Sequence, residues 1–342
     1  MCKHGGSRLS SPPSPYQHPS FFDDRTAMKQ QQKHNGPHHH DESQRRRYTQ
    51  HRNSPNHFCF GRDEIGNLTH DCIVDRLKVM LWKENTIYNY DRFVTTSSAA
   101  TGVARNNATS LTQQHHDAMR RVNPAWRAQI TTWSYSVVDH FHMSRECVAV
   151  SMNLLDRFFA HEEDEASKNK DVLLLVSAAT LSIAIKQIEV DDLSLNALAR
   201  FSRGKFTPTQ ILKMEWQVVR SLDFYLYPPT VTSFAMHLLL LLPHEINERD
   251  RNEMVEYTRF VVELSVADSF FVGNKPAPSI IAVAAIIISL QQCTLSQSSL
   301  STLIEIHYCD VILEQIGIDA TDSRLKESRH RLQLLLENNK RE

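Results

Sequence analysis

The chain has 342 residues, of which 41% are hydrophobic, enough for one large domain or two of ordinary size. Its net charge of −1 hides an asymmetry, because residues 1–56 carry nine Lys/Arg and four Asp/Glu, a net charge of about +5, and the remainder carries about −6. Because its net charge is negative, the folded part does not offer the basic surface that coats nucleic acid. We therefore expect no direct contact with nucleic acid.

The cysteines and the apolar runs indicate where the protein works. The six cysteines form no Cys-x-x-Cys pair, which favours a reduced location in the nucleus or the cytoplasm. The N-terminus lacks the apolar core of a signal peptide, so we do not expect secretion. The runs 172–185 and 280–290 are shorter than the roughly 18 residues of a membrane span. We interpret both as core helices and expect no membrane partner.

Residues 1–66 are rich in Ser, Pro, Gln, Asn and His and lack apolar periodicity, which predicts a disordered tail. Within the tail, His38–His40 could hold a metal ion, but a solvated polar tract explains them better. Arg45–Arg47 leaves a nuclear import signal open, although short basic clusters are common.

Helical periodicity begins after the tail. Residues 70–93 predict an amphipathic helix with Asp71 as its cap, and residues 95–116 predict a polar insert. A second helix is predicted to start after Asn123-Pro124. Its stripe consists of Trp126, Ile130, Trp133, Val137 and Phe141.

Two segments are apolar on every side and predict the central helices of two helical repeats. They are residues 173–185 and 278–290, which share an Ala-Ala pair between Ile, Leu and Val. Ser144 predicts the cap of the helix before the first of them, and 161–166 form an acidic connector. No strand pattern is present, so we predict an all-α fold.

Further signals divide the predicted repeats. Thr207 to Gln210 form a capping box that starts a helix running to about Leu222. Pro228-Pro229 then opens the second repeat, whose first helix ends before Pro243. A final amphipathic helix covers about 322–338. The predicted divisions are 67–226 for the first helix, the insert and the first repeat, 227–320 for the second repeat, and 321–342 for the C-terminal helix.

No motif for catalysis or cofactor binding is present. Gly-rich phosphate loops, kinase catalytic loops, HExxH and GxSxG are all absent, and the chain has nine glycines. The pairs His140/His142 and His115/His116 lack a spaced Cys or carboxylate partner, so we interpret them as ordinary histidines. We predict no catalytic residue, no metal and no cofactor.

One charge lies where an apolar residue is expected. Glu215 falls in the middle of the apolar stripe formed by Ile211, Val218 and Leu222, where an unpaired carboxylate costs several kcal/mol. Lys186 closes the apolar helix that begins at 173. An internal partner for Glu215 and a helix-dipole role for Lys186 explain both residues, and the residues alone favour that interpretation over a binding site.

Six ordered segments resemble the cyclin family and cover both of its repeats, over about residues 70–320. They are WRAQITTW (126–133), LDRF (155–158), LLLVSAATLSIAIK (173–186), KMEWQVVRSLDFYLYPPTVTSF (213–234), ELSVADSFF (263–271) and PSIIAVAAI (278–286). The helix before the first repeat makes the layout most similar to D-type cyclins. Thr132 stands where the family has Asp, which marks an outlying member.

The resemblance assigns roles to charged residues. It implies that Arg127 and Asp156 form a buried ion pair that braces the first repeat, and that Lys186 and Glu215 face a kinase. It further implies a substrate-docking patch formed by Trp126, Ile130, Trp133 and Leu173. In that patch Ser136 replaces the family's acidic residue and Leu174 its Gln, which puts recognition of basic docking peptides in doubt.

The resemblance implies a regulatory subunit, not an enzyme, that binds and activates a cyclin-dependent Ser/Thr kinase in the cell cycle. A transcription-associated cyclin, or a cyclin-fold transcription factor or scaffold, is the alternative. The sequence Lys83-Glu84-Asn85 spells a degradation motif for a ubiquitin ligase, although a helix there would hide it and chance explains it equally well.

Overall fold

The computed structural model describes residues 69–88, 122–161, 169–243, 246–273, 276–293 and 309–339. These ranges are helical with connecting turns and contain no strand, which confirms the predicted all-α class. The predicted tail, the polar insert, His38–His40, His115/His116 and residues 162–166 of the acidic connector lie outside them.

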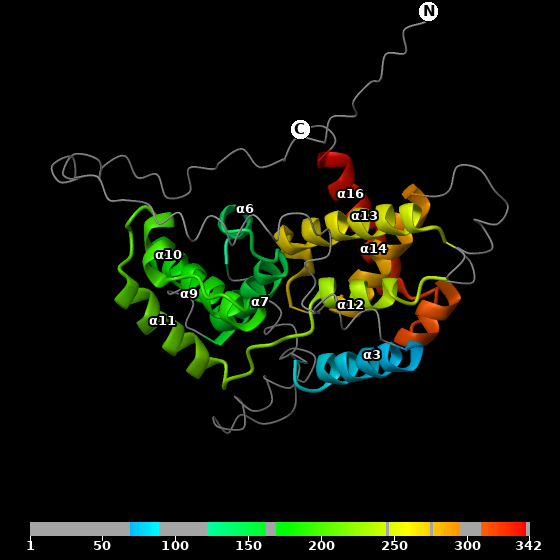
Figure 1. Cartoon of the computed structure of the whole chain (residues 1–342), viewed down its shortest axis with the longest axis horizontal. Helices are drawn as coiled ribbons and strands as arrows, with labels where there is room; N and C mark the ends of the chain where they lie inside the picture. The colour runs from blue at the N-terminus through cyan, green and yellow to red at the C-terminus, as the bar shows by residue number, and fades with distance from the viewer. Residues whose placement is uncertain are drawn as a thin grey trace, which may run out of the picture.

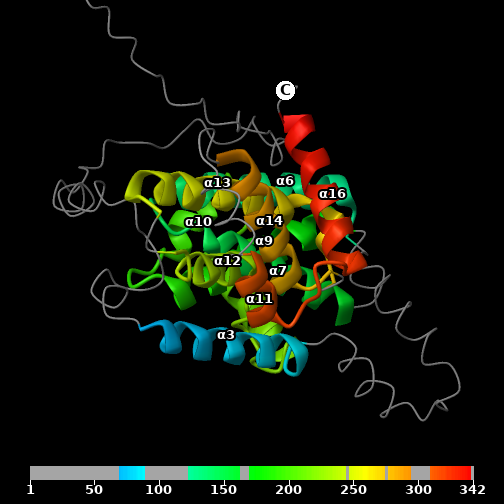
Figure 2. The same ribbon diagram turned by 90° about the vertical axis from the view of Figure 1, so that its right-hand side faces the viewer.

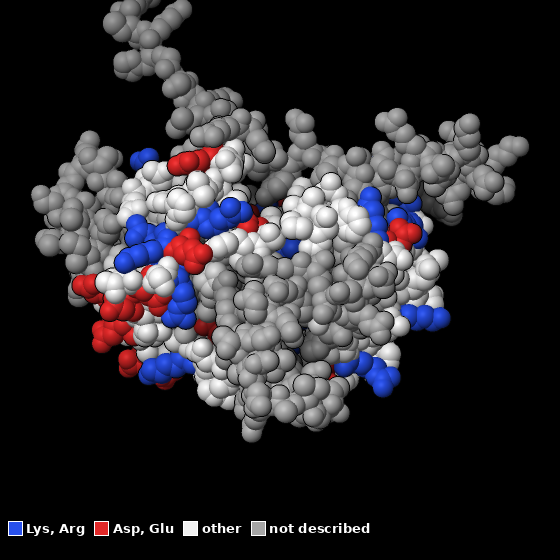
Figure 3. Space-filling view, turned by 180° about the vertical axis from the view of Figure 1, so that it is seen from behind, with Lys and Arg blue, Asp and Glu red and all other residues white. Residues whose placement is uncertain are grey.

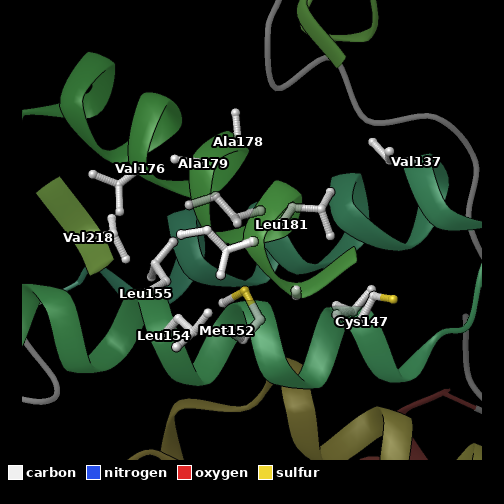
Figure 4. Close-up of a cluster of buried hydrophobic side chains, with 14 of the residues drawn as sticks. Val137, Cys147, Met152, Leu154, Leu155, Val176, Ala178, Ala179, Leu181 and Val218 are labelled. Atoms are coloured by element: carbon white, nitrogen blue, oxygen red, sulfur yellow. The ribbon is translucent and has the colours of Figure 1, made fainter. Parts of the chain in front are cut away.

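Five helices form a first bundle (Figure 1). They are α6 (Pro124–His140), α7 (Glu146–His161), α9 (Lys170–Ile188), α10 (Leu195–Phe201) and α11 (Pro208–Ser221). α9 is the central helix and packs against α7 and α11. Its side chains meet those of α7 in the core, where Met152, Leu155 and Leu181 lie together (Figure 4).

The central helix α9 has the apolar composition of a helix that could span a membrane. α9 is long and apolar enough to cross one, by length and composition alone. Ser177, Ala178, Ala179 and the neighbouring residues have no exposed surface, because other helices surround them. Close packing against α7 brings Ser151 and Thr180 into a buried hydroxyl–hydroxyl hydrogen bond of 3.0 Å. α9 is therefore the core helix that its sequence predicts.

A second bundle follows the linker at 225–230. It contains α12 (Val231–Leu239), α13 (Glu248–Ala267), the short 3-10 helix η1 (Ser269–Phe271), α14 (Pro278–Cys293) and α16 (Ser323–Asn339). α14 occupies the position that α9 has in the first bundle, packing against α12, α13 and α16. Figure 2, which faces this bundle, shows α14 to the left of α16 and between α13 above and α12 below.

Helix α3 (His70–Asn85) lies along α12, at the edge of the second bundle (Figures 1 and 2). The predicted cap at Asp71 was wrong: Thr69 is the N-cap, because its hydroxyl accepts the amide of Cys72, and Asp71 lies in the first turn. The helix also ends earlier than predicted, at Asn85, where Thr86 takes the C-cap position and its hydroxyl donates to the Trp82 carbonyl.

Two other helix starts follow the sequence closely. Asn123 caps α6 with its side chain, ahead of Pro124 at the first helical position. At α11 the Thr207 hydroxyl accepts the Gln210 amide at 3.2 Å, and the Gln210 side chain accepts the Thr207 amide at 2.8 Å. Both sides of the predicted capping box are therefore formed, and they fix the start of the helix that carries Glu215.

Candidate functional site

Lys186 and Glu215 form an ion pair at the surface of the first bundle. Lys186 is in the last turn of α9, and its Nζ lies 2.8 and 2.7 Å from the two carboxylate oxygens of Glu215 on α11. The Glu215 side chain is 8% exposed and the Lys186 side chain is 37% exposed. Glu215 shares its buried face with Ile211 and Val218, so the Lys186 ammonium compensates the carboxylate on an apolar stripe.

The Lys186–Glu215 ion pair does not use all of its hydrogen-bonding groups, so some are available to a binding partner. An ammonium has three N–H donors, and Lys186 directs two hydrogen bonds at Glu215. Each carboxylate oxygen can accept a second hydrogen bond. A docked backbone segment could therefore donate to Glu215 and accept from Lys186, and it would find both groups already held in place.

Large apolar side chains lie exposed on the same helix and the turn after it. Leu212 and Trp216 on α11 are 53% and 56% exposed, and Phe224 and Tyr225 beyond its end are 65% and 45% exposed. The Trp216 and Phe224 rings contact edge to face with centroids 6.3 Å apart, and the Arg220 guanidinium lies over Trp216. An exposed apolar cluster of this kind marks an interaction surface.

The turn that presents Phe224 has an unusual backbone. Asp223 and Phe224 have φ angles of 48° and 64°, in the left-handed region that bulky residues rarely adopt. Such conformations cost roughly 1–3 kcal/mol each and concentrate at functional sites. The amides of Asp223 and Phe224 bond the carbonyls of Arg220 and Val219, which closes the end of α11 and directs Phe224 outward.

The exposed cluster was missed by the residue assignments made from sequence. The signal in the sequence is Trp216, which follows Glu215 and precedes Gln217. On the helix, Trp216 lies on the side of α11 that also carries Lys213 and Arg220. A tryptophan on the polar side of an amphipathic helix cannot belong to the core that the stripe faces. That position alone indicates a surface used for contact.

Arg127 and Asp156 form a second pair, this one inside the protein. Arg127 Nε lies 3.0 Å from Asp156 Oδ1, and Nη2 lies 2.8 Å from Oδ2, with side chains 7% and 6% exposed. Burial raises the pKa of Asp156, and the guanidinium of Arg127 opposes that shift. The third contact of Arg127 was not predicted: Nη1 donates to the Val266 carbonyl at 2.6 Å. Arg127 therefore joins α6, α7 and α13, and with them the two bundles.

The predicted docking patch is mostly covered. Ile130 and Leu173 have no exposed surface and Trp133 is 6% exposed, whereas Trp126 is partly exposed. The three covered residues belong to the first core cluster, and Trp126 packs against it. Docking of substrate peptides at this patch stays a prediction.

Histidine, cysteine and carboxylate side chains in the described ranges form no candidate metal centre. No group of three or more His, Cys, Asp or Glu side chains there could hold a metal ion. The His140 ring packs against Phe141 and Phe201. On the face opposite to that of Figure 1, the visible Lys and Arg side chains are interspersed with Asp and Glu (Figure 3).

Comparisons with known proteins match the central part of the chain. Residues 93–227 match the family model "Cyclin, N-terminal domain". Cyclin-O protein B of Xenopus laevis is 28% identical over 212 residues, which are 60% of this chain and 56% of the relative. Human Cyclin-O is 30% identical over 154 residues, 44% and 43% of the two chains. Cyclin-A2-1 of Arabidopsis thaliana is 26% identical over 183 residues, 53% and 39%.

The chain thus spans about half the length of the curated relatives it matches. Among solved structures, a viral cyclin from herpesvirus saimiri aligns with a TM-score of 0.46 and 16% identity over 62% of this chain and 87% of that one. The similarity in layout to D-type cyclins stays a prediction. The sequence matches lead to one conclusion: the chain is similar to cyclins, and residues 93–227 match their N-terminal domain.

Proposed function

We propose that this protein is the regulatory subunit of a cyclin-dependent Ser/Thr protein kinase, which it binds and activates to control cell-cycle progression. The observation that carries the proposal is the Lys186–Glu215 pair, held at 2.7 Å beside exposed Trp216 and Phe224. A charged pair with unused hydrogen-bonding capacity next to exposed aromatic side chains suits a partner that offers both backbone groups and an apolar face.

Activation in this proposal is a shift in the population of kinase conformations. An active kinase needs its regulatory helix turned inward, so that a Glu on that helix pairs with the Lys that contacts ATP. Trp216, Phe224 and the Lys186–Glu215 pair would contact that helix in its inward position. Binding can shift the kinase only by the difference in affinity for the two conformations. The protein supplies binding energy, and the kinase carries out catalysis.

The test is a pull-down of the tagged full-length chain from its native cells, with mass spectrometry of bound proteins and a kinase assay on the complex. The Lys186→Ala/Glu215→Ala double variant removes the pair. The matched control is Asp171→Ala/Lys205→Ala, which removes another ion pair of α9, at the opposite end of that helix, where Lys205 Nζ lies 2.7 Å from Asp171.

We expect an active kinase with the unmodified chain and with the control, and its loss with the Lys186/Glu215 variant at unchanged thermal stability. Recovery of no kinase, or of a kinase that binds both variants equally, would contradict the proposal and favour a scaffold. The identity of the bound kinase would separate a cell-cycle role from a transcriptional one.

A further inference from the structure

A cavity of about 420 Å³ lies where α3 runs along α12 and the linker at 225–230. Its volume is within the range of about 300–1,000 Å³ that is typical of sites for small organic ligands. Val79 and Tyr227, which line the cavity, are 53% and 45% exposed, so it opens to solvent beside α3. Met236 and His237 line its inner part, because each is 5% exposed. A small molecule could therefore enter from solvent and reach covered surface.

The cavity stays open because α3 makes its buried contacts on another side. Ile73 and Leu77 pack in the second core cluster. At the end of the helix, the Glu84 carboxylate accepts two hydrogen bonds from Ser279 of α14, from the amide at 2.9 Å and from the hydroxyl at 2.6 Å. Side chains on an α-helix point about 100° apart from one residue to the next, so positions 73, 77 and 84 share one stripe. This stripe fixes α3 to the second bundle.

The next stripe of α3 forms one wall of the cavity. Arg76, Val79, Met80 and Lys83 stand at i, i+3, i+4 and i+7, and all four line the cavity. The two apolar side chains lie between the two cations along the helix. The wall therefore combines an apolar middle with a positive charge at each end.

Helix α12 and the linker form the facing wall. Ser233, Met236 and His237 of α12 line the cavity at i, i+3 and i+4, beside Tyr227 and Pro229 of the linker. His237 Nδ1 lies 2.7 Å from the Ser233 carbonyl oxygen, and burial lowers the pKa of His237, so the imidazole is neutral and donates from Nδ1. Methionine adapts its shape to a ligand and contacts aromatic rings favourably. These walls suit a flat aromatic body.

The charges that line the cavity favour an anion. Asp75 Oδ1 lies 3.3 Å from the Lys78 ammonium, and Glu146 Oε1 accepts hydrogen bonds from two hydroxyl groups of the linker and α12. The protein itself thus supplies partners to both carboxylates. Lys83 forms no ion pair or side-chain hydrogen bond within the ranges that the structure describes. The charge that a ligand would meet at this end of the cavity is therefore positive.

We propose that this cavity binds a small aromatic carboxylate, with its rings between Val79, Met80 and Met236 and its carboxylate at Lys83. Such a ligand would contact α3, the linker and α12 at once and would hold α3 against the second bundle. The proposal does not depend on kinase binding, because the residues that line the cavity belong neither to the Lys186–Glu215 pair nor to the exposed cluster on α11.

The test is an NMR titration of the full-length chain with isotopically labelled methionine methyl groups. The probe is a biphenyl carboxylate. Two analogues, with a hydroxymethyl or an aminomethyl group in place of the carboxylate, test the charge preference. Met80 and Met236 report from the cavity, and Met152, in the core of the first bundle, is the internal control. Single Met→Leu substitutions assign the three signals.

We expect the carboxylate to move the signals of Met80 and Met236 together and to leave that of Met152 in place. A probe with about 15 non-hydrogen atoms should bind with a Kd on the order of 0.1–1 mM. The hydroxymethyl analogue should bind about threefold more weakly, because it lacks the attraction to a partly exposed ammonium. The aminomethyl analogue should bind more weakly still, because its charge is repelled.

Two variants and their matched controls locate the ligand. Lys83→Gln should weaken binding of the carboxylate by about threefold and leave the hydroxymethyl analogue unaffected. Lys326→Gln, at an exposed position of α16, should change neither. Val79→Trp should fill the mouth of the cavity and abolish the shifts, whereas Leu334→Trp, at a position that is 37% exposed on α16, should leave them intact.

Three results would overturn the proposal. The first is no movement of the Met80 and Met236 signals at a probe concentration about tenfold above the expected Kd. The second is equal affinity for the three probes in the unmodified chain, and the third is an equal shift at Met152. Circular dichroism checks that each variant is folded. If Val79→Trp does not fold, Lys83→Gln decides by the comparison of the carboxylate with the hydroxymethyl analogue.

Discussion

Arg145 Nε lies 3.0 Å from Glu263 Oε1, an ion pair that joins the start of α7 in the first bundle to α13 in the second. The Glu263 side chain is 14% exposed, and burial raises its pKa to about 7. The charges that face it are Arg145 and Arg259, which lower the pKa, and Asp139 and Glu256, which raise it. The contact between the bundles is therefore sensitive to pH near neutrality.

The first prediction concerns this sensitivity. A carboxyl whose pKa is about 7 when folded and 4.5 when unfolded binds more protons in the folded state between those values, so the free energy of unfolding falls as pH rises through 7. Glu263→Gln should reduce the loss of stability between pH 5.5 and pH 8 by about 2 kcal/mol. Urea denaturation at both pH values measures this difference.

Glu256→Gln is the matched control for this prediction. It lies on the same helix, and its side chain is 59% exposed. Burial also raises the pKa of Glu84, to about 6, but that group titrates equally in both variants and cancels in the comparison. Equal pH dependence in Glu263→Gln and Glu256→Gln would show that Glu263 does not titrate in this range.

The second prediction concerns the buried pair of Arg127 and Asp156. Arg127→Ala leaves a buried carboxylate without its partner and should destabilise the protein by about 3–5 kcal/mol. Arg324→Ala, which removes a guanidinium whose side chain is 61% exposed, should cost less than about 1 kcal/mol. Circular dichroism melts compare the two, and a folded Arg127→Ala with an unchanged melting temperature would refute the structural role.

The third prediction addresses the exposed apolar cluster. Trp216→Ala and Leu212→Ala should each weaken binding of the kinase, with Trp216→Ala losing about 30-fold, because large aromatic side chains dominate interfaces. Leu334→Ala on α16, where the leucine is 37% exposed, should leave affinity unchanged. Titration calorimetry with the recovered kinase measures all three, and equal affinities would place the interface elsewhere.

The fourth prediction tests the turn at Asp223. A glycine adopts positive φ without steric cost, so Asp223→Gly should be neutral or stabilise the protein by up to about 1 kcal/mol. A β-branched residue there should be strained, and Asp223→Val should destabilise by about 1–2 kcal/mol. The melting temperature of Asp223→Gly should therefore equal or exceed that of the unmodified protein, and that of Asp223→Val should be lower. An unchanged melting temperature in Asp223→Val would argue against backbone strain at this position.

Sequence periodicity predicted the helices because their signals are local. Asn123-Pro124 and the Thr207 capping box each act within a few residues, and the boundaries of α6 and α11 followed from them. The cap of α3 was misplaced because Thr69 and Asp71 are both good capping residues, and sequence alone does not choose between them. A sequence pattern predicts the presence of a helix more reliably than it predicts the first residue of that helix.

The candidate site was predictable in part. Glu215 stood out as a charge on an apolar stripe, and the resemblance to cyclins supplied Lys186 as its companion. Glu84 and Ser279 are 195 residues apart, and no local pattern connects them. The contact of Arg127 with the Val266 carbonyl was equally hidden, because any residue carries a backbone carbonyl. Pairings of this kind follow from how the bundles dock.

The contact between Arg127 and Val266 has a practical consequence for dissecting the protein into parts. A fragment that ended in the linker at 225–230 would lack the Val266 carbonyl, which accepts a hydrogen bond from Arg127 Nη1 at 2.6 Å. The guanidinium would then have an unpaired donor beside apolar surface that the second bundle no longer covers. The first bundle on its own would then be less stable and prone to aggregate. Recombinant fragments should carry α6 through α14 together, with their boundaries outside that span.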